Sequence, residues 1–296
     1  MFAHMRKILA AACLAVMGVP ANAVDSPLAD TVTDRVQDCR AGTATNMPLI
    51  AWGADAVTIE ANGGALTSGN GAFADAGWTL DLAVKDDFAA QVSDYLTCES
   101  PFLRGTLGML MAASPVTEAD ARTEQVVIYK HSWSAGDGIV AADGIANAAD
   151  LAGKRIAVQA YGPHIDFVAR ILDDAGLSVD DVDIVWTADL TGTTDSPAAV
   201  LERGEADAAA VILPDARVLT SGGAVGTGAE GSVRGATILV STQEATAVIG
   251  DYIAVRRDFF DANTDAIAAL VNAMFRTEEQ VRAFMARDGS PDQPRL

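Results

Sequence analysis

The sequence has little of what catalysis, metal binding or nucleic-acid binding requires. Its 296 residues include only three histidines and three cysteines, aromatic residues make up 6%, and no basic run occurs. Asp and Glu number 40 against 20 Lys and Arg, which gives a formal net charge of −20. Because binding to a phosphate backbone requires clustered cations, this composition excludes nucleic acid as a partner.

Catalytic and cofactor motifs are also missing. The sequence contains no G-x-S-x-G, H-E-x-x-H, C-x-x-C or G-x-x-x-x-G-K-[ST] pattern. Residues 226–231 fit G-x-G-x-x-G, but they lie in a loop that leads to a strand, whereas a dinucleotide site needs this turn to open a helix. We therefore expect no catalytic residue, no metal site, no cofactor and a protein that is not an enzyme.

The N-terminus has the pattern of a cleavable export signal. Arg6 and Lys7 precede an apolar run of ten residues, 8–17, and Ala21-Asn22-Ala23 matches a cleavage site. Because a span of ~30 Å of hydrocarbon needs a longer helix, we expect 1–23 to be removed and no stable membrane insertion. The exported, periplasmic chain would carry 18 − 40 = −22 charges. A lipoprotein anchor at Cys13 is disfavoured by the short apolar run before it.

Two cysteines remain in the exported chain, Cys39 and Cys98. An even number in an oxidising compartment favours a disulfide between them. Two buried thiols are the alternative, because the sequence does not tell how close the two Cα atoms lie.

The chain alternates short strands and helices in two similar successions. Strands are expected at 48–52, at 78–84 and from 106 in the first, and at 155–159, 183–186 and 208–213 in the second. This order predicts an α/β fold with mostly parallel sheets flanked by helices. We expect lobe one to comprise 24–137 and 241–296, and lobe two 138–240, with a flexible segment at 132–138. The chain would then pass between the two lobes twice, and two such connections form a hinge. Ligands of parallel α/β sheets bind beyond the carboxyl ends of the strands.

Polar and aromatic residues follow several of the expected strands. Tyr161, Gly162 and His164 come after the strand at 155–159, where Gly162 suits a tight turn and the next helix offers free N–H groups. Other strand ends hold or are followed by Trp52, Asp55, Thr187, Asp189 and Asp215, while Arg104 lies just before the strand expected from 106 and Trp133 lies in the flexible segment. Arg104 could clamp a carboxylate or sulfonate or pair with an acidic residue, and either tryptophan could line a pocket or pack in a core. This mixture favours a small polar or zwitterionic ligand.

Three stretches resemble a known family. They are Asp150–Gln159 with the helix end at Ala175–Leu177, Glu202–Ile212, and Gly71–Gly77. Together they are similar to the solute-binding proteins of ABC transporters for nitrate, sulfonate and taurine, a group that includes thiamine-precursor-like binders. The resemblance implies the two-lobe type-two periplasmic-binding fold, closure of the cleft on a small-molecule ligand, and delivery to an ABC permease in the inner membrane. We expect the protein to act as a monomer.

The resemblance also implies positions for the ligand contacts. By position these are Trp52, the loop around Arg104, Ser132, Trp133, Ser134, Tyr161–His164, Thr187–Asp189 and Asp215. Tyr161 and His164 stand where small hydroxyl residues are common in the family, so the identity of the ligand is not inherited. Two other functions stay open. One is an enzyme on the same fold, such as one that makes a pyrimidine precursor, and the other is a ligand-sensing module that presents to a membrane receptor.

Overall fold

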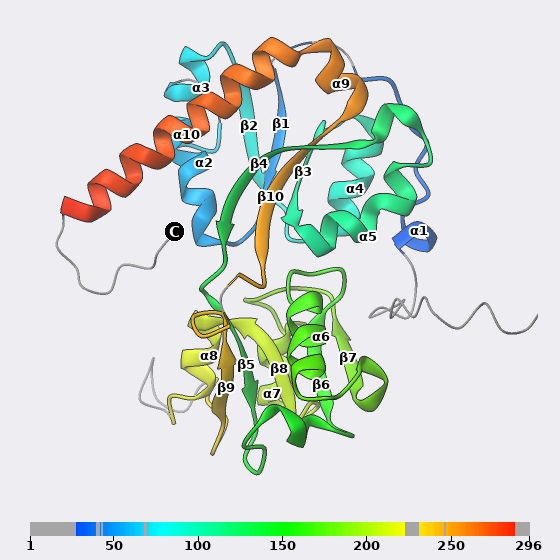
Figure 1. Cartoon of the computed structure of the whole chain (residues 1–296), viewed down its shortest axis with the longest axis vertical. Coiled ribbons are helices and arrows are strands. Elements are labelled where there is room, and N and C mark those ends of the chain that lie inside the picture. The colour runs from blue at the N-terminus through cyan, green and yellow to red at the C-terminus, as the bar shows by residue number, and fades with distance from the viewer. Residues whose placement is uncertain are drawn as a thin grey trace, which may run out of the picture.

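The computed structural model describes residues 28–39, 42, 44–67, 70–222, 231–245 and 247–287. These residues form two lobes, one above the other in Figure 1. The export signal expected at 1–23, the alternative anchor at Cys13 and the glycine-rich stretch from 226 to 230 lie outside the described residues.

The upper lobe contains two small sheets. Parallel strands β1 (Ala44–Leu49) and β2 (Thr79–Val84) form one, and β10 (Gly250–Arg256) lies antiparallel between β3 (Phe102–Thr106) and β4 (Gln125–Trp133) in the other. The helices of this lobe are α1 (Leu28–Thr31), α2 (Ala56–Ala61), α3 (Ala72–Asp75), α4 (Phe88–Thr97), α5 (Leu107–Thr117), α9 (Arg257–Ala262) and α10 (Thr264–Arg287). Its core includes the buried rings of Trp78, Phe102 and Phe259, with centroids 5.9–6.3 Å apart.

The lower lobe is built on one five-stranded sheet. Its strand order is β7 (Asp183–Thr187), β6 (Arg155–Gln159), β8 (Ala208–Ile212), β5 (Asp137–Ala141) and β9 (Thr237–Ser241). The flanking helices are α6 (Ile165–Asp174), α7 (Pro197–Glu202) and α8 (Leu213–Leu219). The run Ala208–Val211 is fully buried, because small side chains on both faces of a central strand let helices pack closely.

Among the described strands, each antiparallel pair includes one of the two strands that begin just after the chain crosses between the lobes. Pairs β1–β2, β6–β7 and β6–β8 are parallel, whereas every antiparallel pair contains β5 or β10. The chain enters the lower lobe between β4 and β5 and returns between β9 and β10 (Figure 1). The two connections are joined side by side, since the Ser134 N–H donates to the Ile249 carbonyl at 2.8 Å. The lobe boundaries expected at 138 and 240 stay a prediction.

Two local expectations from the sequence are wrong. The strand expected from 106 ends there, and the following apolar residues form α5, because the Thr106 hydroxyl accepts from Met109 N at 3.2 Å and caps that helix. The flexibility expected at 132–138 stays a prediction, and β4 and β5 extend into this segment and leave 134–136 between them. The first strand also begins and ends earlier than expected, at 44–49 rather than 48–52.

A disulfide joins Cys39 to Cys98, with their Cα atoms 5.4 Å apart. It links the chain before β1 to the end of α4, where Cys98 adopts a left-handed conformation with φ of 61°. Of the helices that the structure describes, none has both the length and the apolar character needed to span a bilayer.

Candidate functional site

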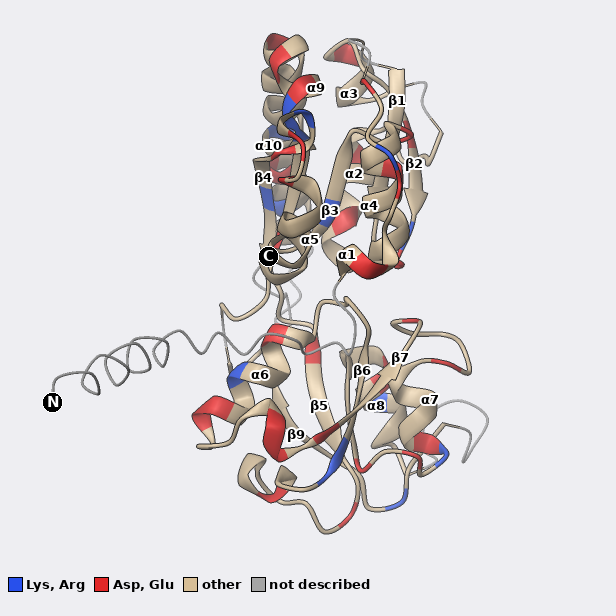
Figure 2. Cartoon of the chain, turned by 90° about the vertical axis from the view of Figure 1, so that its right-hand side faces the viewer, with Lys and Arg blue, Asp and Glu red and all other residues tan. Residues whose placement is uncertain are grey.

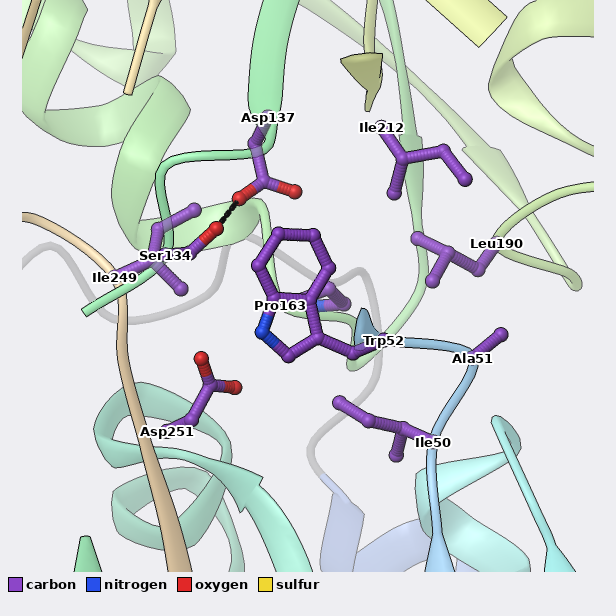
Figure 3. A pocket seen from close by; sticks show the side chains of 10 residues that line it. All are labelled: Ile50, Ala51, Trp52, Ser134, Asp137, Pro163, Leu190, Ile212, Ile249 and Asp251. Carbon is purple, nitrogen blue, oxygen red and sulfur yellow. Dashed lines mark hydrogen bonds between the residues drawn. The ribbon is translucent and has the colours of Figure 1, made fainter. Parts of the chain in front are cut away.

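A cavity lies between the lobes, directly at the two connections. It is lined by Ile50, Ala51, Trp52, Ser134, Asp137, Pro163, Leu190, Ile212, Ile249 and Asp251 (Figure 3). These residues come from both lobes and from both connections. The remaining cavity volume is about 10 Å³, room for no more than one water molecule.

The indole of Trp52 lies in the middle of the residues that line this cavity (Figure 3). Its Nε1 donates to Ser132 Oγ at 3.4 Å on the upper side. Its six-membered ring lies against Gly136 on the lower side, where any side chain would overlap with the ring. Figure 3 shows the indole between the carboxylates of Asp137 and Asp251. A solute could therefore occupy this cavity only if the indole moves.

On the upper side, Asp251 is held by a buried ion-pair cluster. Its Oδ1 accepts from Arg104 Nη1 at 3.1 Å, and its Oδ2 accepts from Ser132 Oγ at 2.8 Å. Arg104 Nε donates to Asp55 Oδ1 at 2.9 Å, and the Arg104 side chain is completely buried. The guanidinium is thus shared by two carboxylates and lies behind Asp251 rather than on the cavity surface.

Burial and charge act against each other in this cluster. Burial raises the pKa of Asp55, and the Arg104 guanidinium opposes that rise. Burial alone would lower the pKa of Arg104, but Asp55 and Asp251 outweigh it and raise that pKa. Arg104 therefore stays charged, and two carboxylates share its single positive charge.

The imidazole of His131 adds a titratable group to the cluster. Its Nε2 lies 3.6 Å from Asp55 Oδ1 and 3.4 Å from Thr58 Oγ1. Burial, and in second place the charge of Arg104, holds the pKa of His131 well below its usual value. His131 is therefore neutral at pH 7 in the folded protein.

The low pKa of His131 predicts a loss of stability in acid. The unfolded histidine takes up its proton as the pH falls below about 6.5, while the folded one resists. The free energy of unfolding should then fall with pH, by up to about 1.4 kcal/mol per pH unit from this group. We expect His131→Gln to lose less stability than the unchanged protein between pH 7.5 and 5.5 in urea titrations. Equal losses in the two proteins would show that His131 does not contribute.

On the lower side, Asp137 is held by a serine and a histidine. Its Oδ1 lies 2.9 Å from Nε2 of the buried His164, and Ser134 Oγ donates to its Oδ2. In a hydrolytic triad the histidine lies between serine and carboxylate, so that it can take the serine proton. Here the carboxylate lies between the other two, and the Ser134 hydroxyl donates to Asp137 and not to the His164 imidazole. This order orients Asp137 and does not create a nucleophile.

The other residues singled out in the sequence lie around this cavity or away from it. Gly162 packs on Gln159, where a side chain would overlap, and Thr187 Oγ1 donates to the Asp189 carbonyl at 3.3 Å. The carboxylates of Asp189 and Asp215 accept from Thr193 and Thr191 at 2.8 and 2.7 Å. Trp133 is 43% exposed, with Lys130 Nζ 4.2 Å from its ring centroid.

The structure thus brings part of the expected set together. Trp52 and Ser134 line the cavity, while Asp55, Arg104, Ser132 and His164 bond to residues that line it. The sequence reasoning missed Asp137 and Asp251, the two lining carboxylates. Both stand near the beginning of strands that follow the lobe connections, and that position was the available signal.

The two lobes are in contact beside the cavity. Gln159 Nε2 donates to the Asp86 carbonyl at 3.3 Å, and the hydroxyls of Tyr161 and Thr31 lie 3.1 Å apart. The Asp166 carboxylate at the start of α6 packs so closely on Gly108 of α5 that a side chain at 108 would overlap with it. The described chain is therefore in a closed arrangement, with Trp52 between the lobes.

Comparisons with known proteins agree with this architecture. The family model described as "NMT1/THI5 like" matches residues 129–283. The alkanesulfonate-binding protein SsuA from Xanthomonas axonopodis pv. citri, bound to MOPS, is 15% identical with a TM-score of 0.59, over 84% of this chain and 77% of that one. The periplasmic aliphatic sulphonate binding protein SsuA from Escherichia coli is also 15% identical, with a TM-score of 0.54 over 83% and 76% of the two chains.

An enzyme shares the fold as well. The desulfurization enzyme DszB is 18% identical with a TM-score of 0.50, over 82% of this chain and 78% of that one. No curated protein gives a significant match to the sequence. These identities establish the fold and not the ligand, and the resemblance first noted in the sequence is confirmed. Since the family model covers more than half of the chain, this protein belongs to the NMT1/THI5-like family and has the two-lobe periplasmic-binding-protein fold.

Proposed function

We propose that this protein is the exported solute-binding component of an ABC importer. It would be secreted by the signal at 1–23, act as a monomer in the periplasm, capture one small polar or zwitterionic organic solute, and deliver it to an ABC permease in the inner membrane. The observation that carries the proposal is the cavity at the hinge, lined from both lobes and covered by Trp52. Its family and the sulfonate-binding proteins of the same fold support the same role.

Ligand capture would follow from an equilibrium between open and closed forms. Opening at the paired connections would separate Gln159 from Asp86 and Tyr161 from Thr31, and would release the indole of Trp52. A solute that contacts both lobes stabilises the closed form by its differential affinity for that form. Trp52 then acts as the residue that the solute displaces, and its ring can cover the solute after closure.

An enzymatic role has weaker support in this geometry. A nucleophile needs a base within hydrogen-bond reach, and the Ser134 hydroxyl is bonded to the Asp137 carboxylate instead. Asp137 and Asp251 are already engaged in orienting contacts, and His164 bonds to Asp137 through its Nε2. We therefore assign the cavity to solute binding. The screen that tests this assignment also searches for reaction products.

A thermal-shift screen tests the proposal. Sulfonates, amino acids, amines, ureas and pyrimidines are each added to the mature protein, and mixtures are analysed afterwards for new products. A true ligand at 100 times its Kd should raise the free energy of unfolding by about 2.7 kcal/mol. Retention of a solute by native mass spectrometry would support the same conclusion. The absence of any stabilising or retained compound would contradict binding, and turnover of a bound compound would instead indicate an enzyme.

Replacement of Gly136 should block the cavity selectively. A leucine at this position would enter the space now held by the Trp52 ring. We expect Gly136→Leu to abolish the thermal shift produced by a ligand while the unliganded protein stays folded. The matched control places a leucine at an exposed position of the lower lobe, Ala146→Leu. A glycine such as Gly153 does not serve, because its φ of +68° would strain a leucine whatever space surrounds it. An unchanged ligand response in Gly136→Leu would place the ligand elsewhere.

A further inference from the structure

We infer that the solute carries a protonated nitrogen, such as an ammonium, amidinium or guanidinium group, that binds between the carboxylates of Asp137 and Asp251. This inference rests on the proposed function and names the chemical class of its ligand. It places a cationic group, and not a sulfonate, at the centre of the cavity, whereas neighbours of the same fold are described as sulfonate-binding.

The lining of the cavity carries the inference. Of the ten lining residues, two are carboxylates and none is Lys or Arg. The carboxylates belong to different lobes, Asp251 to the upper lobe and Asp137 to the lower lobe, and they lie on opposite sides of the Trp52 indole (Figure 3). A sulfonate placed between them would meet two negative groups, whereas a cation would find an acceptor on each lobe.

The basic side chains nearby do not line the cavity: Arg104 and His131 belong to the cluster around Asp55 and Asp251, and His164 bonds to Asp137 Oδ1 at 2.9 Å from within the lower lobe. The Arg104 guanidinium lies behind Asp251 and is shared with Asp55, so its charge is met by two carboxylates. His131 is held neutral by its burial and by Arg104. The cavity therefore presents carboxylate oxygens as its strongest polar groups.

Further carboxylates lie around the closed cleft. Asp86 of the upper lobe is half-buried, and the charge of Asp189 of the lower lobe adds to burial in raising its pKa. Asp215 is also half-buried at the start of α8, and Asp166 lies at the start of α6, where its carboxylate packs on Gly108 of the upper lobe. Figure 2 marks acidic residues at the ends of β5 and α6 that face the upper lobe. Closure brings these like charges together, and a bound cation would offset their repulsion.

Trp52 suits the same class of ligand. Its indole already lies between the two lining carboxylates, so a solute that displaces it leaves the ring as the adjacent wall. The face of a tryptophan attracts cations more strongly than any other aromatic side chain does. The cavity thus combines two acceptors with an aromatic face and an apolar border of Ile50, Leu190 and Ile212.

Isothermal calorimetry with charge-matched compounds tests this assignment. The panel pairs amines, amidines and guanidines with carboxylates and sulfonates of the same carbon skeleton, each titrated into the mature protein. We expect binding by cations, including zwitterions with an ammonium group, and at least tenfold weaker binding in Asp137→Asn and in Asp251→Asn. Asp183→Asn changes the net charge equally on an exposed residue at the far end of the lower sheet, and should bind as the unchanged protein does.

A second variant keeps the test decisive if the Asp251 variant does not fold. Trp52→Ala removes the indole and leaves a cavity bordered by both carboxylates. In this variant benzamidine should bind at least tenfold tighter than benzenesulfonate, which has a similar ring and the opposite charge. Equal or reversed affinities would overturn the inference.

The outcomes separate the inference from the proposed function. Binding of anions alone, unchanged or tightened in the Asp→Asn variants, would overturn the cationic class and leave solute binding intact. If neither cations nor anions bind, and the protein isolated from exporting cells retains no solute, the proposed function fails together with the inference.

Discussion

Replacement of Arg104 by methionine should lower the free energy of unfolding by about 3–5 kcal/mol, the range measured when one partner of a buried ion pair is removed. Arg104 is completely buried and bonds to Asp55 and Asp251 at 2.9 and 3.1 Å. Without it, two buried carboxylates lose their only cation within bonding distance among the described residues. Urea unfolding of the purified variant measures the effect.

Arg170→Ala provides the matched control for this prediction. Arg170 forms an exposed pair with Asp174 one helical turn away, at 3.0 Å. Such exposed pairs contribute about 0–1 kcal/mol, so this variant should unfold almost as the unchanged protein does. Neutralising the partners as well, in Arg104→Met with Asp55→Asn and Asp251→Asn, should recover part of the lost stability. If Arg104→Met keeps full stability and only loses solute affinity, Arg104 binds the ligand directly.

Removal of the disulfide should have an effect of similar size. Cys39 and Cys98 are 59 residues apart, and a loop of that length restricts the unfolded chain by about 4 kcal/mol on the chain-entropy estimate. We expect the double variant Cys39→Ser with Cys98→Ser to unfold at correspondingly lower urea concentration. A reductant should shift the midpoint of the unchanged protein and leave that of the variant where it is.

The double cysteine variant should lose only part of its free energy of unfolding, because other bonds also anchor the segment before β1. Arg256 is buried, and its guanidinium donates to the carbonyls of Gln37 and Tyr95, both at 2.7 Å. These bonds hold the chain before β1 to the end of α4 without the disulfide. The variant should therefore remain folded in the absence of urea. A midpoint equal to that of the unchanged protein would contradict a stabilising role for the disulfide.

Short-range patterns predicted much of the lower lobe. The strands expected from 155, 183 and 208 begin at those residues, because runs of Val, Ile and Ala between turns have one favourable arrangement in a parallel sheet. The same reasoning failed at β3, where Arg104 interrupts a completely buried strand. Its charge is tolerated there because Asp55 and Asp251 come from distant parts of the chain.

The cavity depends even more on distant pairing. Asp137 and Asp251 are 114 positions apart by number, and they meet because β5 and β10 both start beside the paired connections. Trp52 was expected beside a strand end, but its insertion between the lobes requires the close approach that Gly136 permits. No local pattern encodes these contacts, so the sequence could suggest individual residues and not their arrangement.

The central claim is that a solute binds between the lobes in the place of the Trp52 ring. Native mass spectrometry of the protein isolated from exporting cells, with and without a metabolite extract, tests it most directly. We predict one small molecule with a protonated nitrogen per chain in the unchanged protein and none in Gly136→Leu, whose side chain enters the cavity. Equal retention by both proteins, or no retention by the unchanged protein, would contradict the claim.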